Sequence, residues 1–167
     1  QSIITAINNN QKTSLNKKFT EVFNLAEKIS RETDGAFDIT VAPLVNEWGF
    51  GFKKGVDPSK HAIDSLRQIV GYQKVALKDG KIVKQDPRIN LDCSGVAKGY
   101  GSDCVANLLR RHGIENFMVE IGGEVVTSGI NPDRVPWRIG VTKPVDDPTL
   151  QGGELQTVLN VTDKAMA

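Results

Sequence analysis

The stretch LDCSGVAKGYGSD, residues 91–103, combines residue types that could bind a charged ligand. We expect a strand carrying Asp92 and Ser94 to run into a helix here, and free N–H groups at a helix start attract anions. The carbonyl of Gly95 could turn outward toward a hard cation such as Mg²⁺, which accepts carbonyl oxygen. Lys98 adds a positive charge beside the same turn. The alternative is a plain strand-to-helix turn with a solvated lysine, and residue types alone leave both open.

Neither of the two common phosphate loops is present in this stretch. A Walker A loop needs four residues between its first glycine and Gly-Lys-Ser/Thr, and that spacing is missing. The dinucleotide fingerprint also fails, because Gly99-Tyr100-Gly101 is followed by Cys104 where the third glycine belongs. A phosphate site here would therefore be of another kind.

Polar and aromatic side chains near position 40 form a second candidate ligand site. Asp38 and Thr40 lie on one face of an expected short strand, just after Gly35-Ala36, where a ligand could approach the backbone. The alternative is an edge strand with a polar outer face. The aromatic cluster Trp48–Phe52 could stack on a flat ring or could pack within its glycine-rich loop.

Other polar residues suggest no known catalytic arrangement. Glu124, after Gly122-Gly123, could reach a ligand hydroxyl or could simply mark a hairpin corner. Neither His61 nor His112 has a nucleophile or carboxylate at a recognisable spacing, so we expect both at the surface. The two cysteines fit neither a disulfide framework nor a zinc spacing, and we expect buried thiols.

The expected elements follow from hydrophobic periodicity and turn residues. Helices are expected from Thr13 or Ser14 to Gly35, in a short turn beginning at Pro43, from Asp57 to Gly71, and from Tyr100 to Gly113. Strands are expected at residues 37–41, 88–94, 136–144 and 154–162, and in hairpins turning at Asp79-Gly80 and Gly122-Gly123. Helices and mostly antiparallel strands thus interleave without a βαβ rhythm, which indicates an α+β fold.

Composition narrows the class of protein. The 167 residues can form one domain with a core, and we expect a single domain over residues 1–167. Basic and acidic residues number 21 and 20 and are mixed along the chain, which argues against nucleic acid as a partner. No apolar run approaches the roughly 18 residues of a membrane-spanning helix.

Four blocks in order resemble the ApbE family, the FAD:protein FMN transferases once described as thiamine biosynthesis lipoproteins. The blocks are DGAFDITVAPLVNEWGFG, LDCSGVAKGYGSDCVANLL, FMVEIGGEVVTSGINPD and PWRIGVTKP. The resemblance runs from about Thr13 to the last residue, and it implies an ApbE-like, T-fold-like architecture. It also implies binding of FAD and Mg²⁺ and transfer of FMN to a threonine hydroxyl of a target protein, with release of AMP.

The resemblance assigns site residues position by position. Ala36, Phe37 and Asp38 stand where the family holds FAD, and Asp92 and Lys98 stand at further FAD contacts. Gly95 stands where a backbone carbonyl ligates Mg²⁺. The implied targets include subunits of membrane-bound, flavin-dependent redox pumps. Members are typically exported and lipid-anchored, and they face the periplasm in Gram-negative bacteria.

The resemblance also implies segments that this sequence does not contain. The family continues with further metal-ligating and base-supplying motifs, so we assign no catalytic residue here and expect this chain to be a fragment with weak or no activity alone. Two alternatives remain open. One is an FAD pyrophosphatase that produces FMN and AMP with water as the acceptor, and the other is a flavin-binding module without chemistry.

Overall fold

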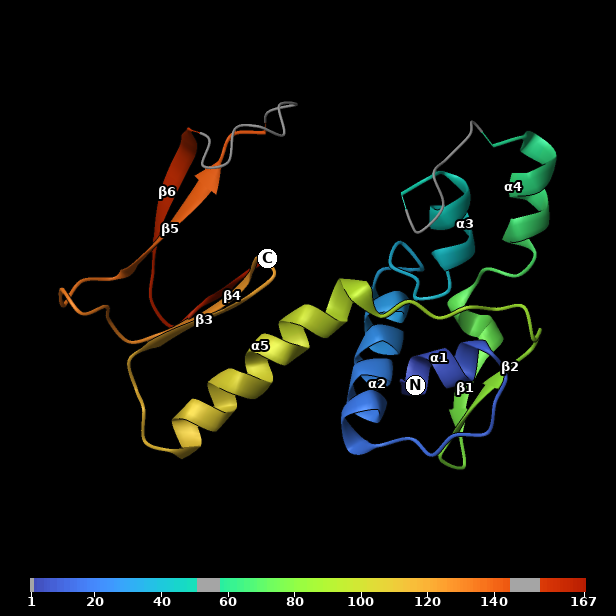
Figure 1. Ribbon diagram of the computed structural model, residues 1–167, viewed down its shortest axis with the longest axis horizontal. Coiled ribbons are helices and arrows are strands. Elements are labelled where there is room, and N and C mark those ends of the chain that lie inside the picture. Colours follow the sequence, from blue (N-terminus) through green and yellow to red (C-terminus); the bar gives the residue numbers. More distant parts are fainter. Residues whose placement is uncertain (1, 51–57, 145–153) are drawn as a thin grey trace. The chain divides into compact units, whose positions relative to one another are not determined.

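The computed structural model describes residues 2–50, 58–144 and 154–167, which form two compact units, residues 1–97 and 98–167 (Figure 1). The helices are α1 (Ile3–Asn8), α2 (Lys17–Glu32), α3 (Ala42–Glu47), α4 (Lys60–Arg67), the 3₁₀ turn η1 (Tyr72–Lys74) and α5 (Ser94–Arg111). The strands are β1 (Val75–Lys78), β2 (Lys81–Lys84), β3 (Phe117–Ile121), β4 (Glu124–Ser128), β5 (Trp137–Thr142), β6 (Leu155–Val161) and β7 (Ala165–Met166). Each described strand pair is antiparallel.

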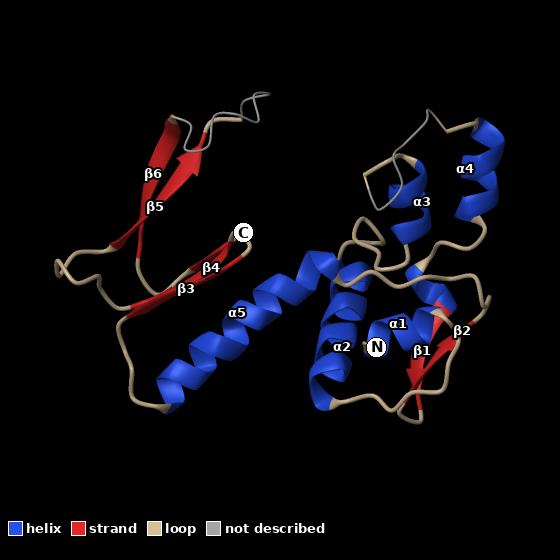
Figure 2. Cartoon of the chain, in the orientation of Figure 1, coloured by secondary structure: helices blue, strands red, loops and turns tan. Residues whose placement is uncertain are grey.

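These elements confirm an α+β fold of interleaved helices and antiparallel strands (Figure 2). That a single domain spans residues 1–167 stays a prediction. Among the described residues, no helix combines the length and the apolarity needed to cross a membrane.

The long helix of the first unit is α2, and it has an apolar stripe along one face. Val22, Phe23 and Ala26 are buried on that face. The helix is capped by Asn16, whose side-chain oxygen accepts from the Phe19 amide at 2.8 Å. The predicted cap at Thr13 or Ser14 was therefore wrong, because asparagine satisfies a first-turn donor equally well.

Helices α3 and α4 confirm two shorter predictions. Proline lies in the first turn of α3, and Ser59 caps α4 by accepting from the Ala62 amide at 3.2 Å. Helix α4 ends at Arg67, earlier than the expected Gly71. Trp48 and Phe50 are exposed rather than packed, and Phe52 lies outside the described residues.

The first unit also contains the β1–β2 hairpin. Asp79 and Gly80 have φ values of 49° and 70°, which are the two positive values that a type I′ turn requires. Lys78 and Lys81 face each other across this turn. The hairpin predicted from the Asp-Gly pair is confirmed.

Two predicted strands of the first unit were wrong. Residues 37–41 form turns, and residues 88–93 join no sheet (Figure 2). The burial alternation in the second segment is nevertheless real, since Ile89, Leu91 and Cys93 are buried. A side chain takes the place of a neighbouring strand there: Asn8 accepts from the Leu91 amide at 2.8 Å and donates to the Leu91 carbonyl at 3.0 Å.

The second unit packs α5 against the β3–β4 hairpin. Its core consists of residues from the helix and from both strands: Ala106, Phe117, Val119 and Val126, with Leu109 packed beside them. Gly122 and Gly123 have φ values of 57° and 94°, which confirms the predicted turn between the strands. Strand β7 extends this sheet beside β4, and β5 pairs with β6 as a separate hairpin.

Candidate functional site

Two of the segments predicted to bind a ligand meet within the first unit. The Asp92 amide donates to the Ile39 carbonyl at 2.7 Å, which joins the segment after α2 to the segment before α5. The Phe37 ring lies against Gly95, with its Cε2 atom 2.9 Å from the place where a Cβ would stand. The structure therefore brings together five of the six predicted site residues in one unit: Ala36, Phe37, Asp38, Asp92 and Gly95.

Helix α5 begins earlier than expected, and this changes the surroundings of Gly95. We predicted a start near Tyr100, but the helix begins at Ser94, so Gly95 lies in its first turn. The early start follows from local hydrogen bonding, since Asp92 Oδ1 accepts from the Ser94 amide at 2.8 Å. A helical carbonyl is directed along the helix axis, so the loop-like turn expected at Gly95 is absent.

The Asp38 carboxylate is the centre of a local hydrogen-bond network. Its Oδ1 atom accepts from the Thr40 amide and the Thr40 hydroxyl, both at 2.7 Å. Its Oδ2 atom accepts from the Tyr72 amide at 2.7 Å. The fully buried Thr40 hydroxyl in turn accepts from the Gly71 amide at 2.7 Å. Asp38 thus fastens the turn after α2 to the backbone that leads into β1.

Tyr72 is a neighbour of the predicted site that sequence reasoning missed. Its ring atom Cε1 lies 3.4 Å from the place where a Cβ of Gly35 would stand, next to the exposed Ala36. The side chain therefore lies over the turn that carries Ala36 and Phe37. The only sequence signal was an aromatic residue after a glycine, and nothing in the sequence paired it with Asp38.

Both carboxylate oxygens of Asp38 accept hydrogen bonds from described residues, whereas only one oxygen of Asp92 does. Its Oδ1 atom accepts from the amide and the hydroxyl of Ser94. No described residue donates a hydrogen bond to its Oδ2 atom. One oxygen of Asp92 thus remains available as an acceptor at the start of α5.

Lys98 belongs to the second unit, where it contacts the β3–β4 turn. Its Nζ atom donates to the Gly122 carbonyl at 2.9 Å and forms an ion pair with Glu124 Oε1 at 3.1 Å. The Lys98 side chain is 48% exposed, so we assign this pair little stability. Sequence reasoning considered both Lys98 and Glu124 as ligand contacts but did not predict that they pair.

A complete metal site is not visible among the described residues. Within those residues, no three His, Cys, Asp or Glu side chains lie close enough together to hold a metal ion. The Gly95 carbonyl and the free oxygen of Asp92 cannot alone provide the octahedral oxygen set that Mg²⁺ demands. His61 and His112 are both exposed, as expected.

The two thiols should differ strongly in reactivity. Burial, with a further contribution from the Asp92 charge, raises the pKa of the Cys93 thiol to about 11. Cys104 is only half-buried. Because the thiolate is the reactive form, we expect a disulfide reagent at pH 8 to modify Cys104 and leave Cys93 intact until the protein unfolds. Cys104→Ser should abolish the native-state reaction, and equal reaction rates for both thiols would contradict the assignment.

Comparison with known proteins shows which family this chain resembles. The ApbE family model matches residues 1–167. An FAD:protein FMN transferase of Vibrio cholerae is 43% identical over 129 residues, which cover 75% of this chain and 39% of the relative. One from Haemophilus influenzae is 35% identical over 155 residues, which cover 89% of this chain and 44% of the relative.

Solved structures agree with the sequence comparison. The flavin transferase ApbE from Vibrio cholerae matches this chain with a TM-score of 0.83 at 35% identity. The match covers 98% of this chain and 53% of the chain in that structure. The apo form of Pseudomonas stutzeri flavinyl transferase ApbE matches with a TM-score of 0.78 at 28% identity. That match covers 96% of this chain and 51% of the chain in the solved structure. The chain thus spans about half the length of these solved relatives, its ApbE-like fold is confirmed, and it belongs to the ApbE family.

Proposed function

We propose that the protein containing this chain is a Mg²⁺-dependent FAD:protein FMN transferase. It moves FMN from FAD to a threonine hydroxyl of a target protein and releases AMP. Membership of the ApbE family and the names of the relatives support flavin transfer. The observation that carries the proposal is the contact of Ala36–Asp38 with the start of α5, because it joins two predicted FAD-binding segments within one unit.

The proposed reaction is a phosphoryl transfer. The threonine oxygen attacks the phosphorus of the FMN half of the pyrophosphate, and the bond from that phosphorus to the bridging oxygen breaks. AMP leaves with the bridging oxygen, and the hydroxyl proton passes to a base. Such a reaction needs positive charge and oriented donors around the pyrophosphate. When bound, Mg²⁺ would supply part of that charge.

The residues of this chain support a division of roles. Asp92 has a free carboxylate oxygen, so we assign it the hydrogen bond to a flavin, ribityl or ribose donor. Asp38 is occupied by Thr40 and Tyr72, so we assign it the task of holding the FAD-binding turn in place. Lys98 is half-exposed, and we assign it to a non-bridging phosphate oxygen.

Partners and location are part of the same proposal and rest on the family resemblance. The acceptors are subunits of membrane-bound, flavin-dependent redox pumps. The whole protein is exported, lipid-anchored and faces the periplasm. Fractionation of cells that express the whole protein tests the location, because a protein recovered only in the cytoplasm would contradict it.

The decisive experiment follows the products of FAD cleavage. The protein is incubated with FAD and Mg²⁺, with and without an acceptor subunit whose threonine is either present or replaced by alanine. AMP release together with covalent flavin on the threonine-bearing acceptor supports the transferase. Equal release of FMN and AMP without an acceptor would instead indicate a pyrophosphatase, and FAD binding without cleavage would indicate a flavin-binding module.

Asp92→Asn should weaken FAD binding about tenfold or more, because a hydrogen bond to a carboxylate contributes roughly 1.5–3 kcal/mol. Calorimetric titration with FAD, with and without Mg²⁺, measures the change, and FMN serves as a ligand control. Asp64→Asn, on the exposed face of α4, is the matched control and should bind FAD normally. Unchanged affinity in Asp92→Asn would remove Asp92 from the site.

A further inference from the structure

Among the described residues, no strand lies beside the outer edge of β2. In the part of the chain that the structure describes, this sheet consists of β1 and β2, and the Gln85 amide donates to the Lys74 carbonyl at 2.9 Å. Hydrogen-bonded pairs alternate along an antiparallel ladder, so Val83 bonds to β1, whereas Ile82 and Lys84 do not. The backbone N–H and C=O groups of Ile82 and Lys84 therefore point away from β1. No described residue bonds to these four groups.

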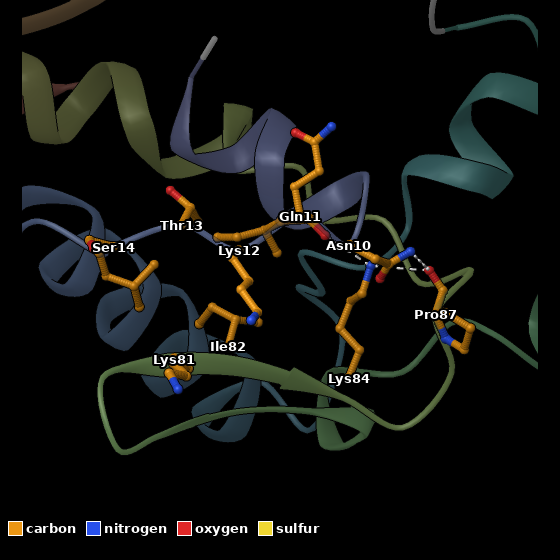
Figure 3. A pocket seen from close by; sticks show the side chains of 11 residues that line it. Asn10, Gln11, Lys12, Thr13, Ser14, Lys81, Ile82, Lys84 and Pro87 are labelled. Atoms are coloured by element: carbon orange, nitrogen blue, oxygen red, sulfur yellow. Dashed lines mark hydrogen bonds between the residues drawn. The ribbon is translucent and has the colours of Figure 1, made fainter.

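A hollow of about 760 Å³ lies along this open edge. Figure 3 shows Lys81, Ile82 and Lys84 on the strand, with Thr13 and Ser14 on the loop that faces it. The described residues that line the hollow are Ile7, Asn10, Gln11, Lys12, Thr13, Ser14, Leu15, Lys81, Ile82, Lys84 and Pro87. A volume of this size matches that of ordinary ligand sites, and its position leaves room beside the strand.

The charge of the hollow has one sign. Of the described residues that line it, three are lysines and none is aspartate or glutamate. The Lys84 ammonium is already occupied, because it donates to the carbonyls of Ile7, Pro87 and Ile89 at 3.0–3.1 Å. Burial lowers the pKa of Lys84, partly offset by the charge of Asp86. Lys12 and Lys81 form no ion pair with any described residue, so they remain available to an incoming anion.

We propose that this open edge binds an extended segment of a partner polypeptide, which adds to β2 as a third strand. The segment alternates apolar and acidic residues. Its backbone bonds to Ile82 and Lys84, as in other cases of strand addition to a sheet edge. The inference does not depend on flavin transfer, because its residues are not among those assigned to FAD.

The alternation follows from the two faces of β2. The Ile82 side chain is half-buried, and Ile7 and Leu15 line the same hollow, so one face of an added strand meets apolar groups. Lys81 is exposed on the opposite face of the strand, because successive side chains alternate. An added strand with valine on the first face and glutamate on the second would match both surfaces.

Binding is tested with a fluorescein-labelled peptide of alternating valine and glutamate. We expect fluorescence anisotropy to report saturable binding that the double variant Lys12→Glu/Lys81→Glu weakens at least fivefold. Lys60→Glu on α4 is a single charge reversal that lies outside the hollow and should leave binding unchanged. A peptide of alternating valine and lysine should not bind, and equal binding of the two peptides would overturn the proposal.

Amide hydrogen exchange distinguishes strand addition from charge attraction alone. Bound peptide should slow exchange at Ile82 and Lys84, whereas Leu77, whose amide faces the opposite edge of the hairpin, should not change. Binding without this protection, or displacement of the peptide by millimolar inorganic phosphate, would replace the proposal with a simple anion site. Protection of both amides before any peptide is added would mean that the protein's own chain occupies the edge, and would overturn it as well.

Discussion

Gly95→Ala should destabilise the protein although it replaces glycine with the best helix former. An added Cβ would stand 2.9 Å from Cε2 of Phe37, closer than carbon atoms pack, so the ring must move. Such overpacking typically costs about 1–3 kcal/mol. The gain in helix propensity is at most ~1 kcal/mol, and it is smaller in the first turn, where Gly95 lies. We therefore expect a lower melting temperature and, because Phe37 is displaced, weaker FAD binding.

Gly99→Ala is the matched control in the same helix. Apart from its chain neighbours and the backbone of its own helix, no described atom lies within 4 Å of the Cβ that it would add, so only the gain in helix propensity acts. This variant should be stabilised by about 1 kcal/mol, which corresponds to a rise of roughly 2–4 °C in melting temperature. Thermal denaturation shows directly whether the melting temperature of each variant falls or rises. A stabilised Gly95→Ala would show that the Phe37 ring moves without cost and does not constrain the site.

The features that the sequence predicted correctly depend on neighbouring residues. Asp79-Gly80 and Gly122-Gly123 adopt positive φ values readily, so each pair sets its hairpin locally. The apolar spacing along α2 likewise needs no distant partner to define its buried face. The register of these elements could therefore be inferred without a structure.

The two segments wrongly predicted as strands do alternate apolar and polar residues, but neither forms backbone hydrogen bonds with a neighbouring described strand. Leu91 is held by the side chain of Asn8, which occupies both backbone groups that a neighbouring strand would use. The turn at residues 37–41 is set by Asp38, which bonds to Thr40 and to the distant Tyr72. Alternation reports burial and not pairing, so no local pattern could distinguish these segments from strands.

The candidate site was predictable in its segments but not in its contacts. The Phe37 and Gly95 segments were both singled out, and they do meet. The ion pair between Lys98 and Glu124 and the position of Tyr72 arise from tertiary packing. A single sequence, without related sequences to compare, gives no signal for contacts between residues far apart in the chain.

Asp38→Asn should loosen the turn that carries Ala36 and Phe37. If the amide oxygen keeps the bonds from Thr40, the amide nitrogen replaces Oδ2 and meets the Tyr72 N–H, so two donors face each other. Losing a hydrogen bond to a carboxylate and leaving its donor unsatisfied costs about 1–3 kcal/mol. We expect the melting temperature to fall and amide exchange to accelerate at Tyr72. Asp64→Asn removes the same charge on α4 and should change neither quantity.

Amide exchange and FAD affinity, measured together, distinguish a positioning role of Asp38 from direct contact with the flavin. A positioning residue acts through the turn, so Asp38→Asn should accelerate amide exchange at Gly71 and Tyr72 even without FAD, and saturating FAD should restore much of the protection. Asp92→Asn should leave this exchange unchanged and lower only the affinity, because its free oxygen supports no described backbone group. Normal exchange at Tyr72 in Asp38→Asn together with weakened FAD binding would contradict the positioning role. It would make Asp38 a direct ligand contact, and the network around Thr40 would then be too weak to hold the turn by itself.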